Sequence, residues 1–181
     1  MAVPIYDYSD HLESERLRTR FMKIEDAVAW TGFYKDKEAV ELFPRYGDKT
    51  DEELARLWIE RQIARYASNR LGLQALIDKK TDEWIGQAGL MIQEVDGRSE
   101  VEVGYHVFKK YWGQGYAPEA AKLFLDYGFK NNFADSIISI IDTRNTKSMR
   151  VADKNGLTRE KQTVWLDLNV YIYRIRKEEW R

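Results

Sequence analysis

Apolar residues recur along this chain at two spacings, which predict alternating strands and helices. Helical spacing is clearest from Asp51 to Ala67, behind an acidic first turn, and a second helical stretch begins at Glu25-Asp26. Runs with the alternation or continuous apolar character of strands are Glu15 to Phe21, Leu71 to Ile77, Trp84 to Val95, Val101 to Phe108 and Ser136 to Ile141. This order predicts a mixed α/β protein.

Turn and cap residues mark the element boundaries of the second half. Asp96-Gly97 is a strong hairpin signal. Asn145 can cap a helix that holds Ser148 and that Gly156 ends. Val164 to Ile175 predicts a closing strand pair, which turns near Asp167-Leu168-Asn169. With three prolines and no Gly/Ser-rich linker, the 181 residues predict a single domain, 1–181.

The strand from Val101 to Phe108 has two chemically different faces. Val101, Val103, Tyr105 and Val107 share one face by period two, and Glu100, Glu102, Gly104 and His106 share the other. We therefore expect one side of this strand to pack in a core and the other to carry chemistry.

The segment Trp112 to Glu119 follows this strand and leads into an amphipathic helix. Its two glycines, Gly113 and Gly115, allow a tight turn and close approach of a ligand to the backbone. Pro118 suits the first helical turn. Free N–H groups at the start of a helix bind anions, so the loop is a candidate site for a phosphate-bearing cofactor. The alternative is a plain strand-to-helix turn, which the two glycines alone favour. The segment does not match the P-loop, because Tyr116-Ala117 replace its Lys-Ser or Lys-Thr pair. It does not match the dinucleotide fingerprint, because Pro118 replaces the third glycine.

Composition excludes several other classes of protein. The net charge is −1 with interspersed signs, so no nucleic-acid footprint is present. The absence of cysteine and the presence of only two histidines argue against a metal site. Met1 to Asp10 lacks the apolar core of a signal peptide, and no run is long enough to span a membrane. We therefore expect a cytoplasmic protein.

The glycine loop resembles that of the GNAT superfamily of acetyl-CoA-dependent N-acetyltransferases. The family's Arg/Gln-x-x-Gly-x-Gly/Ala maps onto Trp112 to Ala117, with Trp112 in place of the usual Arg or Gln. This form looks like the Tyr-Trp-Gly-x-Gly-Tyr-Ala-x-Glu-Ala segment of the Rim-type ribosomal-protein N-terminal acetyltransferases. Three further matches follow the order of that branch: Glu13 to Arg18 with Glu25-Asp26, Gly104-Tyr105, and Asn145-x-x-Ser148 with Lys154 to Leu157.

The resemblance implies a fold and a cofactor. The fold would be the GNAT α/β (α+β) fold, whose mixed, mostly antiparallel sheet splays between its fourth and fifth strands and carries helices on both faces. Acetyl-CoA would lie in the opening, with its pantetheine along the fourth strand and its pyrophosphate on the amides of Gly113 to Ala117. The residues expected at the cofactor are His106, Val107, Phe108, Trp112, Gly113, Gln114, Gly115, Tyr116, Ala117, Asn145 and Ser148. Asn145 also fits a plain N-cap, and both roles can hold at once.

The implied reaction is attack of a primary amine on the thioester. Glu102 is the first candidate for the base that deprotonates the amine, and the alternative is a solvated strand residue paired with cations. His106 has a suitable pKa but is better explained as a structural histidine. A main-chain N–H near Val107 would hold the oxyanion, and Ser148 or Tyr171 would protonate the leaving thiolate.

The acceptor amine is not specified by the sequence. It would be a protein N-terminus or a small molecule, and the resemblance implies a groove between the first two helices and the last strand pair. Most aromatic residues of that region are better explained as packing, so the loop Phe43-Pro44-Arg45-Tyr46-Gly47 is the candidate part of the groove. Arg45 could pair with an acidic substrate group or be simply solvated. Two other classes of function are a non-catalytic acyl-CoA-binding or regulatory module and a nucleotide-phosphate binder. The closing strands would also offer a sheet edge for a homodimer.

Overall fold

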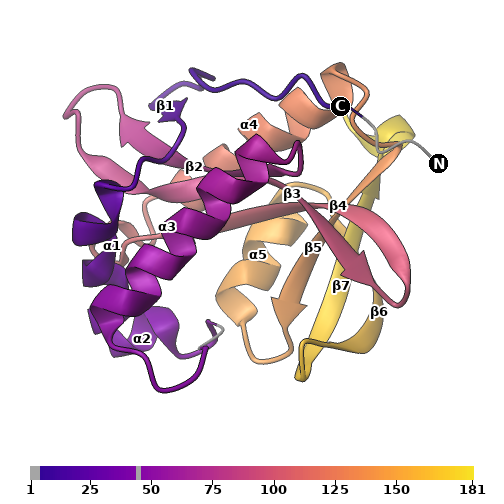
Figure 1. The fold of residues 1–181 in the computed structure, drawn as a ribbon. Helices are drawn as coiled ribbons and strands as arrows, with labels where there is room; N and C mark the ends of the chain where they lie inside the picture. The colour runs from indigo at the N-terminus through magenta and orange to yellow at the C-terminus, as the bar shows by residue number, and fades with distance from the viewer. Residues whose placement is uncertain (1–4, 44–45) are drawn as a thin grey trace.

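A computed structural model describes residues 5–43 and 46–181. Its strands form one seven-stranded sheet in the order β1-β2-β3-β4-β5-β7-β6. All neighbouring strands are antiparallel except β4 and β5, which run parallel (Figure 1). The strands are β1 Leu17–Arg20, β2 Leu71–Asp78, β3 Trp84–Val95, β4 Arg98–Val107, β5 Ser136–Asp142, β6 Thr158–Trp165 and β7 Leu168–Arg176. The GNAT-type sheet expected from the sequence is confirmed.

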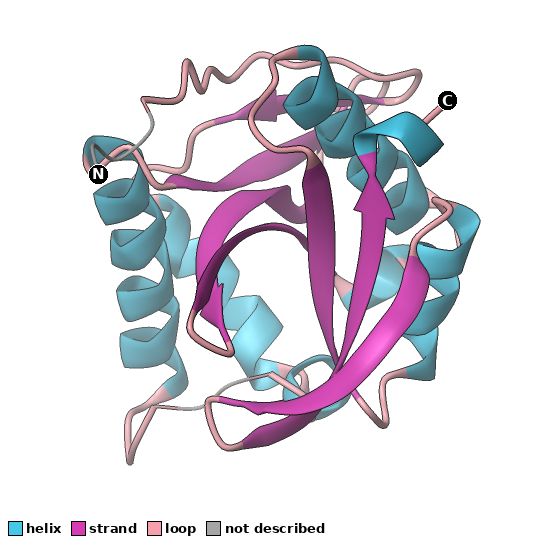
Figure 2. Ribbon diagram, turned by 90° about the vertical axis from the view of Figure 1, so that its right-hand side faces the viewer, coloured by secondary structure: helices cyan, strands magenta, loops and turns pink. Residues whose placement is uncertain are grey.

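The helices lie on both faces of this sheet, as Figure 2 shows from the side. They are α1 Asp26–Lys35, α2 Lys37–Val40, α3 Asp51–Ala67, α4 Tyr116–Lys130 and α5 Thr146–Lys154, with short 3₁₀ turns at Lys109–Tyr111 and Lys177–Glu179. One buried cluster joins α1 and α3 to the sheet, and another joins α4 and α5 to its opposite face. The period-two interpretation of β4 is confirmed, since Val103 packs in the α4 cluster while the His106 ring contacts Phe33 and Phe43 on the α1 side.

Local signals explain why several boundaries match the sequence analysis. The Thr50 side chain accepts the amide of Glu53, whose carboxylate accepts the amide of Thr50, so α3 begins with a complete capping box. Asp96 and Gly97 both have positive φ, 49° and 75°, which is the backbone that a tight hairpin between β3 and β4 requires.

The structure differs from the sequence predictions at the closing strand pair and at α2. The closing strand pair begins at Thr158 rather than Val164, because β6 is an edge strand whose first five residues are exposed and lack an apolar alternation. Its turn falls at Leu166 and Asp167, both with positive φ. The short helix α2 was not predicted. Asp36 starts it by accepting the amides of Glu38 and Ala39.

The sheet splits between β4 and β5. These strands pair only at Val101 with Ile137 and at Glu102 with Ile138, and beyond this point they diverge (Figure 1). The remainder of β4, from Val103 to Val107, is therefore bonded to β3 alone along its length. This leaves a backbone edge that faces an opening in the sheet.

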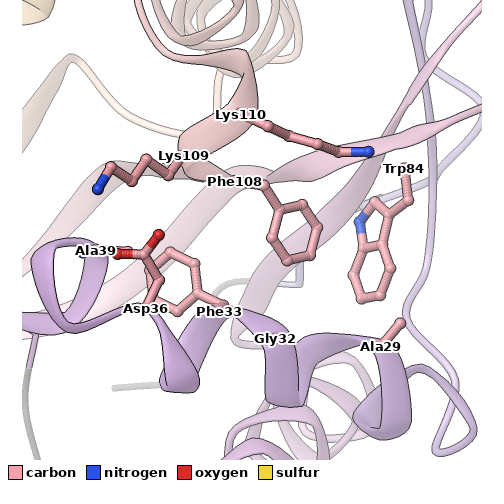
Figure 3. A pocket seen from close by; sticks show the side chains of 9 residues that line it. All are labelled: Ala29, Gly32, Phe33, Asp36, Ala39, Trp84, Phe108, Lys109 and Lys110. Carbon is pink, nitrogen blue, oxygen red and sulfur yellow. Dashed lines mark hydrogen bonds between the residues drawn. The ribbon is translucent and has the colours of Figure 1, made fainter.

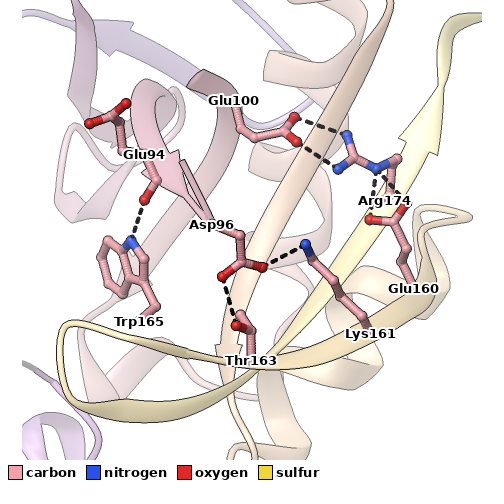
Figure 4. A network of polar contacts seen from close by, with 8 residues as sticks. All are labelled: Glu94, Asp96, Glu100, Glu160, Lys161, Thr163, Trp165 and Arg174. Carbon is pink, nitrogen blue, oxygen red and sulfur yellow. Dashed lines mark hydrogen bonds and ion pairs between the residues drawn. The ribbon is translucent and has the colours of Figure 1, made fainter. Parts of the chain in front are cut away.

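A polar network fixes the closed end of this split (Figure 4). Arg174 of β7 donates to both carboxylate oxygens of Glu100 on β4, at 3.0 and 2.8 Å, and to Glu160 on β6 at 3.0 Å. It also reaches the Ser136 hydroxyl of β5 at 2.7 Å. Because one guanidinium joins four strands, the closed end is rigid while the other end stays open.

Candidate active site

The glycine loop forms the rim of the split where α4 begins. Gly113 and Gly115 have φ of 75° and 81°, so both glycines adopt the left-handed backbone that the loop needs. Gly115 is the N-cap of α4 and supplies no side-chain cap. Among the hydrogen bonds of the described residues, none has the amides of Gly113 to Ala117 as donors. Five adjacent N–H groups at a helix start are thus available to an anion.

Side chains outside the loop hold it in this shape. Arg16 of the N-terminal segment donates to the Gln114 carbonyl at 2.9 Å and to Glu119 at 2.6 Å, and its guanidinium stacks 4.3 Å from the Tyr116 ring. The Tyr116 hydroxyl donates to Asp78 at 2.8 Å. These contacts hold the loop in one conformation, so little conformational entropy remains to be lost when it binds an anion.

The backbone of β4 offers hydrogen-bonding groups to the split. The Phe108 amide is bonded to the Ile85 carbonyl of β3 at 3.0 Å. Alternation along an antiparallel pair then directs the main-chain groups of His106 toward β3 and those of Tyr105 and Val107 into the split. The Val107 carbonyl accepts the Trp112 indole N–H at 2.7 Å, which ties the loop to the strand. Of the three residues expected along the pantetheine, Val107 alone turns its main chain to the opening.

Residues of α5 line the opposite side of the split. Asn145 is the N-cap of this helix and accepts the Ser148 amide at 3.0 Å, which confirms the predicted cap. The Ser148 hydroxyl lies 3.0 Å from the Tyr105 hydroxyl of β4. Burial raises the pKa of Tyr105 to about 12, so its proton is retained at neutral pH. Sequence reasoning missed this pair, because 43 residues separate its members.

Glu102 lies at the closed end of the split and is only 7% exposed. Its carboxylate accepts the Gln93 side-chain amide at 2.8 Å and the Ile140 amide of β5 at 3.4 Å. Burial raises the pKa of Glu102 to about 7. The solvated alternative is therefore wrong, since the side chain points under α3 rather than into water. A carboxyl that titrates near neutrality suits proton transfer.

His106 has the structural role that the sequence favoured. Its ring packs against Phe43 and Trp58. The Gln87 carboxamide oxygen accepts the Trp58 indole N–H, so its NH₂ group is left to donate to His106 Nδ1 at 3.2 Å. Burial lowers the pKa of His106 to about 3, which keeps the ring neutral.

Two candidates remain, Tyr171 and Arg45. Tyr171 is on β7, which pairs with β5 and β6 rather than β4, and the Arg159 guanidinium covers its ring at 4.6 Å. The structure does not bring Tyr171 next to Ser148 or Glu102 by any hydrogen bond among the described residues. Arg45, with Pro44, lies outside those residues.

An open pocket of about 360 Å³ lies between α1 and the end of β4 (Figure 3). Its walls are mainly apolar and aromatic. Lys109 and Lys110 extend from its upper rim in opposite directions. The lining residues are Ala29, Gly32, Phe33, Asp36, Ala39, Trp84, Phe108, Lys109 and Lys110. The pocket thus lies on the α1 side of the sheet, where the His106 ring also contacts Phe33.

Comparison of the sequence with known families identifies the class of protein to which the chain belongs. Residues 16–158 match the family model described as Acetyltransferase (GNAT) domain, so the chain belongs to the GNAT acetyltransferase family. It is 31% identical over 176 residues to the uncharacterized N-acetyltransferase p20 of Bacillus licheniformis, covering 93% of this chain and 97% of that protein.

Solved structures show the same fold. A GNAT-family acetyltransferase from Bacillus anthracis has a TM-score of 0.75 at 26% identity, covering 93% of this chain and 99% of that one. Mycobacterium smegmatis RimJ in complex with CoA-disulfide has a TM-score of 0.75 at 20% identity, covering 90% and 83%. The GNAT fold expected from the sequence is therefore present. No helix within residues 5–43 and 46–181 combines the length and apolar character that crossing a membrane requires.

Proposed function

We propose that this protein transfers an acetyl group from acetyl-CoA to a primary amine, which is a protein N-terminus or a small molecule. The observation that carries the proposal is the row of amides from Gly113 to Ala117, which have no partner among the described residues. They lie beside a split where the β4 edge also lacks a paired strand in the described part of the chain. A pyrophosphate fits the row of loop amides, and the amide groups of a pantetheine arm fit the β4 edge. Trp112, Asn145 and Ser148 would flank that arm.

Acetyl-CoA would supply a thioester carbonyl open to attack by the amine. The amide of Val107 points into the split and would stabilise negative charge on that carbonyl oxygen. Glu102 would take the proton of the incoming ammonium, directly or through water, since its pKa of about 7 lies near the working pH. Tyr105, held by Ser148, would donate its proton to the departing thiolate, a role that the sequence alone assigns to Ser148 or Tyr171.

The acceptor would approach from the side of α1 and α3. Glu102 and His106 face that side, and so does the pocket beside Phe108. An aromatic and apolar wall there favours an amine attached to an apolar body over a highly charged one.

The test is an acetylation screen in which released thiol is measured against a panel of peptide N-termini and small amines. With any acceptor found, Glu102→Gln should lower kcat by roughly 10²-fold while the Kd for CoA stays unchanged. If no amine in the panel is acetylated although CoA binds, the alternative of a non-catalytic acyl-CoA-binding module is supported.

A further inference from the structure

Three charged side chains meet at the open end of the split. Glu38 of α2 holds the Lys109 ammonium at 2.7 Å through Oε2 and the Lys147 ammonium at 2.9 Å through Oε1. Lys109 follows β4, and Lys147 lies in the first turn of α5, which follows β5. One carboxylate therefore joins cations from the two sides of the split.

Lys147 also crosses the opening itself. Its ammonium lies 4.0 Å from the ring centroid of Trp112, the residue that begins the glycine loop. A cation over an indole face is attracted by the ring quadrupole. A side chain from the β5 side thus rests on a side chain from the β4 side, next to the unpaired amides of Gly113 to Ala117.

The geometry of this cluster is that of an anion site. Two ammonium groups this close would repel each other without an anion between them. The hydrogen bond from Lys109, followed by that from Lys147, lowers the pKa of Glu38 to about 2, so Glu38 is fully ionised at neutral pH. A phosphate has the same oxygen acceptors and carries more charge, so it would compete with this carboxylate.

We propose that Lys109 and Lys147 form a phosphate-binding pair for CoA, and that Glu38 occupies this pair until a CoA phosphate displaces it. The proposal rests on the acetyl-CoA function proposed above and adds residues outside the glycine loop to the binding site. It also makes α2 a built-in competitor of the cofactor.

The test is the Kd for CoA, measured by isothermal titration calorimetry on the full chain. Glu38→Gln removes the competing charge, so CoA should bind about threefold more tightly. Lys147→Gln removes a cation from the pair, so CoA should bind about tenfold more weakly. Both residues are exposed, and the unliganded melting temperatures should stay unchanged.

The ion pair between Lys35 and Glu52 provides matched controls. It spans 2.9 Å, is exposed to a similar degree and joins α1 to α3. Glu52→Gln and Lys35→Gln should leave the Kd for CoA unchanged, because neither residue belongs to the cluster at the split.

Ligands that lack phosphates identify the group that is bound. The increase in affinity that Glu38→Gln gives for CoA should be absent for pantetheine, which has no phosphate. If dephospho-CoA keeps the gain, the lysines bind the pyrophosphate; if dephospho-CoA loses it, they bind the 3′-phosphate.

Three results would overturn the inference while leaving the proposed function standing. These are unchanged binding in Glu38→Gln, weaker binding in Glu38→Gln, or an equal gain with pantetheine, each with a wild-type protein that binds CoA. A wild-type protein that does not bind CoA at all would instead contradict the proposed function and, with it, the inference.

Discussion

The hydroxyl of Tyr105 lies 3.0 Å from the hydroxyl of Ser148, across the split that separates β4 from β5. This contact is the middle one of three side-chain contacts that span the split. Glu102 reaches the Ile140 amide at the closed end, and Lys147 lies over Trp112 at the open end. The two halves of the sheet are thus connected by side chains where their backbones separate. A cofactor that enters the split meets these side chains in turn.

The Tyr105 bridge predicts a specific kinetic defect. If Tyr105 protonates the leaving thiolate, Tyr105→Phe should lower kcat by roughly 10²-fold with little change in the KM for acetyl-CoA. Tyr127→Phe is the control, because its hydroxyl bonds Ser9 and the Asp7 carbonyl, away from the split. Steady-state kinetics measures kcat and the KM for acetyl-CoA in both variants. Equal kcat values for the two variants would make Tyr105 a packing residue only.

Glu102 predicts how stability depends on pH. Its folded pKa of about 7 lies above the ordinary value of 4.5, so the stability it contributes is present below pH 4.5 and is lost as the pH rises through 7. Glu102→Gln does not titrate. Its stability relative to wild type should therefore rise by about 2 kcal/mol between pH 5 and pH 8. Urea unfolding at the two pH values measures this difference. A difference that does not change with pH would show that Glu102 titrates as an ordinary carboxyl.

The glycine loop can be tested with a matched pair of glycine substitutions. Gly115 and Gly97 both have positive φ, so a side chain strains either backbone by about 1 kcal/mol. Only Gly115 lies in the loop that we propose binds the pyrophosphate. Gly115→Glu should weaken CoA binding by at least about tenfold, whereas Gly97→Glu in the β3–β4 hairpin should not, as calorimetry would show. Equal affinities would place the pyrophosphate elsewhere.

The closed end of the split should depend on Arg174. Its side chain is 13% exposed and serves both Glu100 and Glu160, so Arg174→Met leaves half-buried carboxylates unpaired. We expect a loss of about 3 kcal/mol in the free energy of unfolding. Arg56→Met, which breaks the exposed pair with Glu60 on α3, should cost no more than about 0.5 kcal/mol. Equal losses of unfolding free energy in the two variants would show that Arg174 does not stabilise the closed end of the split.

Elements whose ends are set by local interactions could be predicted from the sequence, whereas elements held by long-range contacts could not. The helix Asp51–Ala67 and the strand Trp84–Val95 could be delimited because their ends are set by local features, the Thr50–Glu53 cap and the Asp96-Gly97 turn. The strand Thr158–Trp165 could not, since its polar residues are held by pairing with β7 rather than by burial.

The same distinction applies to the site. The glycine loop is a local feature, and its free amides follow from two glycines before a helix. The contact between Tyr105 and Ser148 and the cluster of Glu38, Lys109 and Lys147 arise only when distant segments meet. Arg16, which fixes the loop from the N-terminal segment, belongs to the same group. No spacing along the chain identifies such pairs.

The most direct measurement is thermal unfolding of the wild-type protein titrated in parallel with acetyl-CoA, CoA, ATP and NAD. At about 100 times the Kd, a ligand stabilises the native state by roughly 2.7 kcal/mol, which for a chain of this length raises the melting temperature by about 5–10 °C. We predict this rise with acetyl-CoA and CoA and none with ATP or NAD. No rise with either CoA ligand, or equal rises with all four ligands, would contradict an acyl-CoA site in the split.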